Sequence, residues 1–160
     1  MRWMTVWVRV AVWAAVAVSS GRTFSGASVG VACDSMQPGH LSLGAQTSSP
    51  PYGIFITPRN TSYYVTVYGQ GNREFKGFLL QARDEKGQRV GRFTKVQKPG
   101  RIIECSFDGG AVQHRRGDSK TQVTARWEPQ GFKGQMQFRA TVVESYTTYW
   151  MDVLSEHLSF

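Results

Sequence analysis

The sequence lacks most of the short motifs that mark an active site, and its histidines are few. No His-Glu-x-x-His, Cys-x-x-Cys or P-loop pattern occurs, which argues against a zinc protease, a dithiol oxidoreductase and a nucleotide-hydrolysing enzyme. The three histidines, His40, His114 and His157, stand far apart in the chain. We therefore predict a protein with no catalytic site, no cofactor and no bound metal.

Long hydrophobic runs are absent beyond the N-terminus. The one apolar run, Val10–Val18, is shorter than the ~20 residues that a membrane-spanning helix needs. It follows a basic start and ends in Ser19-Ser20-Gly21, a pattern typical of a secretory signal peptide. We predict a signal peptide over residues 1–21, one domain over residues 22–160, no transmembrane anchor, and a secreted, extracellular product.

Cysteines are also scarce. The chain has two, Cys33 and Cys105, and an even pair in an exported chain predicts a disulfide. That bond would close a loop worth roughly 4 kcal/mol of stability. The rival interpretation is a zinc site completed by His40 and His114, although these spacings are wider than those of the usual structural zinc motifs.

Acidic residues are fewer than basic ones, and the formal net charge is +8. Arg2 and Arg9 belong to the predicted signal peptide, which leaves +6 for the rest of the chain. A positive excess favours anionic partners, here microbial surface polymers or sulfated glycans. Nucleic acid is not an expected partner, because export removes the chain from it.

The basic residues gather in two places. The candidate anion-binding residues are Arg115, Arg116 and Lys120, which follow His114, because guanidinium groups pair well with phosphate and sulfate. A second cluster consists of Arg89, Arg92, Lys95, Lys98 and Arg101. The alternative is that both clusters are solvated edges whose charges discourage pairing between strands of different molecules.

Short strand patterns recur from Tyr52 onward, separated by turn residues. The clearest is residues 135–142, where apolar and polar side chains alternate with period two. Residues 22–50 are rich in Gly, Ser and Pro and predict an irregular segment. The absence of a long helical pattern predicts an all-β, immunoglobulin-like antiparallel β-sandwich of about eight short strands.

A modification site is also predicted. Asn60-Thr61-Ser62 is an N-glycosylation sequon in a chain expected to be exported. It follows the turn-forming Pro58, so we expect Asn60 on a solvent-facing turn that carries a glycan.

Several segments resemble the reeler (reelin N-terminal) domain over residues 27–153, nearly the whole predicted mature chain. The segments that carry the resemblance are Cys33–His40, Pro51-Tyr52, Phe75–Arg83, Gly91–Phe93, Cys105, Trp127–Pro129 and Tyr149-Trp150. The most specific is Phe-Lys-Gly-Phe-Leu-Leu-Gln-Ala-Arg at residues 75–83. Two places depart from the family pattern: the loop at residues 60–64 is shorter, and residues 112–114 read Val-Gln-His.

The resemblance implies an extracellular immunoglobulin-like sandwich with an internal disulfide. The family occurs in matrix and neuronal guidance proteins, in membrane reductases whose redox chemistry lies in other domains, and as small stand-alone defence proteins of insect type. The last group implies a role in innate immunity through antibacterial binding to microbial surfaces. The alternatives are an extracellular matrix or adhesion module that binds glycosaminoglycan or a protein partner, and a carrier of an apolar ligand between the sheets.

Overall fold

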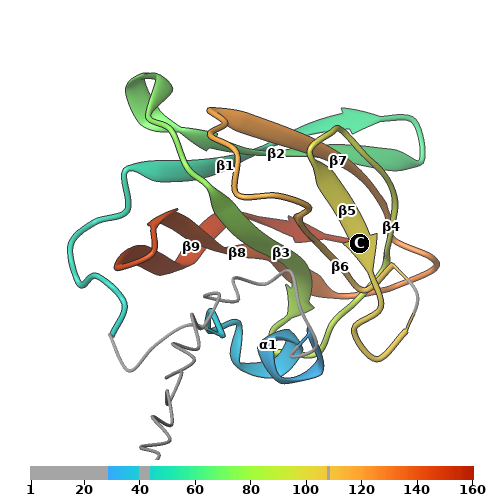
Figure 1. The fold of residues 1–160 in the computed structure, drawn as a ribbon. Helices are drawn as coiled ribbons and strands as arrows, with labels where there is room; N and C mark the ends of the chain where they lie inside the picture. The colour runs from blue at the N-terminus through green and yellow to red at the C-terminus, as the bar shows by residue number, and fades with distance from the viewer. Residues whose placement is uncertain (1–28, 40–43, 108) are drawn as a thin grey trace, which may run out of the picture.

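Two antiparallel sheets pack face to face in the computed structural model, which describes residues 29–39, 44–107 and 109–160 (Figure 1). The four-stranded sheet has the order β1-β2-β7-β4, and the five-stranded sheet has the order β5-β6-β3-β8-β9. The strands are β1 (Tyr52–Arg59), β2 (Ser62–Gly69), β3 (Gly77–Asp84), β4 (Arg92–Val96), β5 (Gly100–Ile103), β6 (Ala111–His114), β7 (Gln122–Glu128), β8 (Gln135–Ser145) and β9 (Thr148–Ser159). The predicted all-β sandwich is confirmed, and the described residues form nine strands where about eight were predicted.

The space between the sheets is filled by the alternating side chains that the sequence pattern singles out. Every second residue of β7 and of the first part of β8 points inward and is at most 2% exposed. This set consists of Val123, Ala125, Trp127, Met136, Phe138, Ala140 and Val142. The rings of Trp127 and Phe138 meet edge to face with centroids 5.3 Å apart, so the two sheets interlock through aromatic packing.

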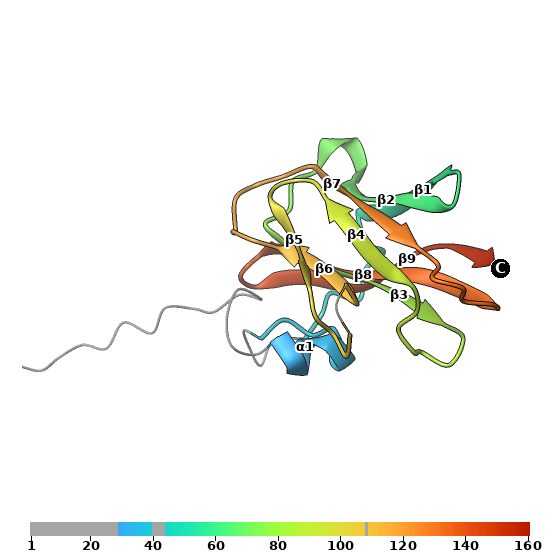
Figure 2. The same ribbon diagram turned by 90° about the vertical axis from the view of Figure 1, so that its right-hand side faces the viewer.

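The segment predicted to be irregular contains a helix. α1 (Val29–Ser35) lies on the outer face of the five-stranded sheet, away from the four-stranded sheet (Figures 1 and 2). A second, smaller apolar cluster forms beneath it, made of Ala32, Cys33, Met36, Leu79, Cys105, Ala111, Val143 and Tyr149. The Thr141 hydroxyl on β8 donates a hydrogen bond to the Met36 carbonyl at 2.7 Å, which fixes the end of this segment on the sheet.

β3 is buried on both faces because α1 covers the sheet there. Residues 77–82 are all buried, which explains why Phe78, Leu79 and Leu80 are consecutive apolar residues and do not alternate with polar ones. Leu80 joins the core between the sheets, and Leu79 joins the cluster under α1. β3 therefore contributes both to the main core and to the cluster under α1.

The predicted signal peptide, residues 1–21, lies outside the described residues. Within the described ranges, no helix has the length and apolar character that crossing a membrane requires.

A short 3-10 helix, η1 (Gln70–Asn72), follows β2 and completes the elements.

Candidate functional site

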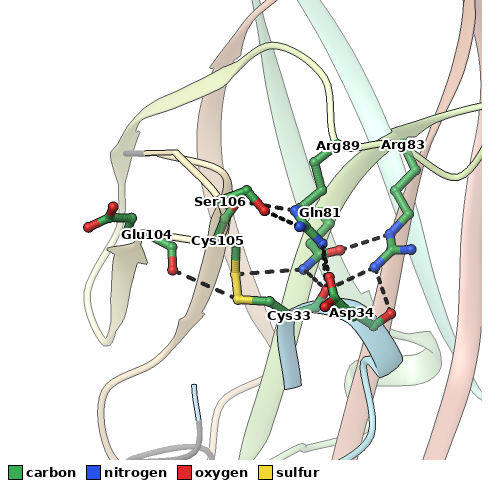
Figure 3. The surroundings of a disulfide bond; sticks show 8 residues. All are labelled: Cys33, Asp34, Gln81, Arg83, Arg89, Glu104, Cys105 and Ser106. Carbon is green, nitrogen blue, oxygen red and sulfur yellow. Dashed lines mark hydrogen bonds and ion pairs between the residues drawn. A yellow bond between two sulfur atoms is a disulfide. The ribbon is translucent and has the colours of Figure 1, made fainter. Parts of the chain in front are cut away.

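A disulfide joins Cys33 in α1 to Cys105, which follows β5 (Figure 3). The Cα atoms lie 5.6 Å apart and the two residues are 72 positions apart in the sequence. The predicted disulfide is confirmed. The rival zinc site is wrong, because each sulfur is bonded to the other and neither remains as a thiolate ligand.

Polar side chains from β3 and from the segment after it surround this disulfide (Figure 3). The Cys33 carbonyl oxygen accepts three hydrogen bonds: from Gln81 Nε2 at 2.8 Å, Arg83 Nη2 at 2.9 Å and Arg89 Nη1 at 3.0 Å. Arg83 also donates to the Asp34 carbonyl at 3.0 Å. The last carbonyls of a helix have no partner within the helix, so these side chains supply the donors that the end of α1 needs.

Arg89 links both sides of the disulfide. Its Nε donates to the Cys105 carbonyl at 3.1 Å, and its Nη1 pairs with the Asp34 carboxylate at 2.8 Å. A further N–H of Arg89 donates to the Ser106 hydroxyl. We call Cys33, Cys105, Gln81, Arg83 and Arg89 the disulfide cluster. Its two arginines bind groups of the fold itself, so Arg89 does not act as a free member of the second basic cluster.

The electrostatics of the disulfide cluster agree with this structural role. Burial lowers the pKa of Arg83, and the neighbouring Arg139 and Arg89 guanidinium groups lower it further. An arginine under this influence stays charged, because its ordinary pKa lies far above neutral pH.

Sequence reasoning did not assign a role to Gln81 and Arg83. The signal that could have found them is two polar residues at alternate positions at the end of a strand that is otherwise apolar on both faces.

Two exposed basic segments meet at another corner of the sandwich. The Arg115 N–H donates to the Pro99 carbonyl at 2.8 Å, and Gly100 pairs with His114 across β5 and β6. The turn that carries Lys98 therefore lies beside the loop that carries Arg115 and Arg116. All three basic side chains are exposed, and none pairs with a carboxylate among the described residues. We call Lys98, Arg115 and Arg116 the basic corner.

Lys120, the third candidate anion-binding residue, does not extend this exposed surface, contrary to the sequence-based prediction. The residue is only 8% exposed. Its ammonium group donates to the Lys76 carbonyl at 2.7 Å and to the Asp118 carbonyl, and it lies 5.6 Å from the centre of the Phe75 ring. Burial lowers the pKa of Lys120 to about 8, with Asp118 acting in the opposite direction. The hydrogen bonds of its amino group thus hold the loop before β7 in place.

The histidines do not form a metal site in the described part of the chain. His114 is buried, and its Nδ1 accepts a hydrogen bond from the Phe78 N–H at 3.2 Å. Among residues 29–39, 44–107 and 109–160, no three His, Cys, Asp or Glu side chains are grouped so that they could hold a metal ion. His40, the other candidate ligand, lies outside the described residues.

One pattern associated with catalysis does occur in the sequence. Residues 26–30 read Gly-Ala-Ser-Val-Gly, which has the Gly-x-Ser-x-Gly spacing of many serine hydrolases. Ser28 lies outside the described residues. In hydrolases this serine needs a histidine base, whereas the buried His114 bonds the backbone of β3. The prediction that the chain is not an enzyme therefore rests on the absence of the His-Glu-x-x-His, Cys-x-x-Cys and P-loop patterns.

Asn60 lies at the tip of the hairpin that joins β1 and β2. The register pairs Arg59 with Ser62, which leaves Asn60 and Thr61 as a two-residue turn. Asn60 is exposed and has a φ of 53°, a left-handed conformation that asparagine tolerates better than most residues. The Asn60 side chain is therefore accessible, while Ser62 of the sequon is only 4% exposed; glycosylation of Asn60 stays a prediction.

Comparison with known proteins gives relatives of two kinds. A Drosophila melanogaster protein named as a defense protein is 32% identical over 148 residues, a match that covers 89% of this chain and 92% of that protein. Ferric-chelate reductase 1 of Bos taurus is 34% identical over 131 residues, which make up 76% of this chain but only 21% of the reductase. The likeness to the reductase thus concerns one part of that larger protein.

A solved structure shares the fold. The crystal structure of the human F-spondin reeler domain superposes with a TM-score of 0.60 at 17% identity, and the match covers 73% of this chain and 94% of that one. Identity this low supports the immunoglobulin-like fold alone. The family model of the reeler domain matches residues 31–160. This chain therefore belongs to the reeler domain family.

Proposed function

We propose that this chain is a secreted defence protein that acts by binding anionic polymers of microbial surfaces and not by catalysis. The observation that carries the proposal is the coverage of its relatives. The match to the Drosophila melanogaster defense protein spans nearly all of both chains, whereas the match to the reductase leaves most of the reductase unmatched. The likeness to the defense protein thus extends over nearly the whole of that protein, whereas the likeness to the reductase is confined to one part of it.

The basic corner supports binding of a phosphate- or sulfate-bearing polymer. Arg115 and Arg116 are exposed and have no carboxylate partner among the described residues, and the turn with Lys98 lies beside them. Cations that are not paired within the protein attract anions without first losing an internal bond. The disulfide cluster and Lys120 do not compete for this role, because their cationic groups donate to backbone carbonyls.

The test is a binding measurement with a matched control. The full chain, secreted and oxidised, is titrated with purified lipopolysaccharide and with lipoteichoic acid, and an uncharged polysaccharide serves as the reference ligand. The variant Arg115→Ala/Arg116→Ala removes two charges of the basic corner. The control Lys86→Ala/Lys133→Ala removes two exposed charges from other loops.

We expect the arginine variant to bind roughly 5- to 30-fold more weakly at low salt, because two exposed ion pairs with phosphate contribute about 1–2 kcal/mol together. The control variant should bind nearly as well as the unchanged chain. Binding should also weaken between ~0.01 M and ~1 M ionic strength, since the screening length falls from ~30 Å to ~3 Å. Equal binding by both variants would exclude the basic corner. If the chain bound heparin more tightly than the microbial polymers, the alternative function as an extracellular matrix module would be favoured.

A further inference from the structure

The outer face of the four-stranded sheet carries an open groove that the proposed function does not use. The groove has a volume of about 660 Å³ and crosses β1, β2 and β7. Its walls come from residues that oppose one another across the strands: Phe55 lies opposite Thr66, and Tyr64 lies opposite Arg126. This face points away from the core. Its Ser62 and Thr66 side chains are buried, whereas Phe55 and Tyr64 are open to a ligand.

Two aromatic rings in this groove are unusually open. Phe55 is 46% exposed and Tyr64 is 40% exposed. Beside them, the hydroxyl groups of Thr66 and Thr124 lie 2.8 Å apart on neighbouring strands. Aromatic faces next to hydroxyl groups suit a sugar ring, whose C–H face packs on an aromatic ring while its own hydroxyl groups bond polar side chains.

Arg126 adds a directed donor to the same groove. Its Nη2 lies 3.2 Å from a carboxylate oxygen of Glu128, so one side of the guanidinium group is paired. Its Nε is buried and has no acceptor among the described residues. That atom is closed to a ligand, but Arg126 lines the groove and its side chain is 32% exposed, so the outer N–H groups of its guanidinium can donate to a sugar oxygen.

The groove ends at the glycosylation sequon. Asn60 itself lines the groove, on the turn between β1 and β2. A sugar attached to its side-chain amide would therefore begin within the groove. A tethered ligand also has an effective concentration in the millimolar range or above, so weak stacking on two rings suffices to hold it.

We propose that the groove holds the first sugars of an N-linked glycan attached to Asn60, which pack on Phe55 and Tyr64 and accept a hydrogen bond from Arg126. The glycan covers two exposed aromatic rings and shields β1, an edge strand of its sheet, from pairing with other chains. This inference rests on the proposed export, because N-glycans are added in the secretory pathway. It does not rest on polymer binding at the basic corner.

The test uses the full chain secreted by a eukaryotic host. Mass spectrometry of the peptide that contains Asn60 measures the attached glycan. Thermal unfolding then compares the glycosylated chain with Asn60→Gln, in the unchanged background and with Phe55→Thr/Tyr64→Thr. Threonine replaces the rings with a residue that also favours strands. The control Tyr146→Thr removes an aromatic residue that is 48% exposed on the turn between β8 and β9.

We expect the glycan to raise Tm by roughly 2–5 °C in the unchanged and control backgrounds and by less than ~1 °C without the two rings. Proton NMR should show contacts between the first sugars of the glycan and both rings. An equal glycan effect in all backgrounds would overturn the proposal. So would binding of added oligosaccharide to the two rings of the glycosylated chain, because the groove would then be open. Secreted chain without a glycan on Asn60 would overturn it as well and leave the export itself unaffected.

Discussion

Removal of the disulfide should destabilise the sandwich by an amount set mainly by loop length. Cys33→Ala/Cys105→Ala releases two residues 72 positions apart. The loop-entropy relation gives about 4.4 kcal/mol for a closure of this length at 25 °C. For a domain of this size, the loss corresponds to a fall in Tm of roughly 12–20 °C.

The assay is urea unfolding followed by circular dichroism and tryptophan fluorescence. The double alanine variant should unfold at lower urea, and its m value should rise because the unfolded chain becomes less compact. Hydrogen exchange should also be faster in α1, while the strand amides of β3 keep their order of protection. The sheets should remain, because the core between them contains neither cysteine.

Reduction of the unchanged chain provides the matched control. A reducing agent should lower the stability of the unchanged chain to that of the double alanine variant and leave the variant unaffected. If the variant and the oxidised chain unfolded at the same urea concentration, loop closure would not be what the bond contributes. If the variant lost its β-sheet signal altogether, the core between the sheets would not be sufficient to hold the fold.

Three further changes test individual contacts. Arg83→Met removes donors from the end of α1 and should cost about 1–3 kcal/mol, with faster amide exchange in α1. The pKa of Lys120 is about 8 in the folded chain and 10.5 ordinarily, so the unfolded chain binds more protons between these pH values and stability should rise from pH 8 to 10.5. The rise should be roughly 1–2 kcal/mol, since water screens part of the effect, and Lys120→Met should lack it in pH-dependent urea titrations. Gly91→Ala should cost more than ~2 kcal/mol, because φ is 63° and the added Cβ would lie 2.1 Å from a Trp127 ring carbon. Gly87→Ala has a φ of 75° but no heavy atom within 4 Å of the added Cβ, and it should cost about 1 kcal/mol.

Each of these expectations has a result that would contradict it. Unchanged α1 exchange in Arg83→Met would mean that the arginine does not hold the helix end. A pH dependence that is the same with and without Lys120 would place the titrating group elsewhere. Equal losses for Gly91→Ala and Gly87→Ala would mean that contact with the Trp127 ring contributes nothing and that only the backbone conformation matters.

The strands were predictable from the sequence because burial follows a local pattern. On β8, alternate side chains of residues 135–142 enter the core. Because successive side chains of a strand point to opposite faces, this burial appears in the sequence as an alternation of apolar and polar residues. The reeler resemblance identified the fold family from residues 75–83, which belong largely to β3, the strand buried on both faces.

The N-terminal helix and the roles of the cations were not predictable in the same way. α1 contains Gly30 and two valines and has no acidic residue in its first turn, so its local preference for helix is weak. The disulfide, Gln81 and the two arginines Arg83 and Arg89 hold it, and those contacts span 48 to 72 positions in the sequence. Arg89 and Lys120 each resemble a surface charge in the sequence, and only the fold shows that backbone carbonyls take their hydrogen bonds.

The most direct test of the division between structural and available cations is a nitrogen-detected NMR titration of the oxidised chain with a phosphorylated oligosaccharide from a microbial polymer. We predict shifts for the side-chain nitrogens of Lys98, Arg115 and Arg116, and none for those of Arg83 and Arg89, which stay bonded to carbonyls near the disulfide. Shifts in Arg83 and Arg89 with none at the other three residues would contradict the account.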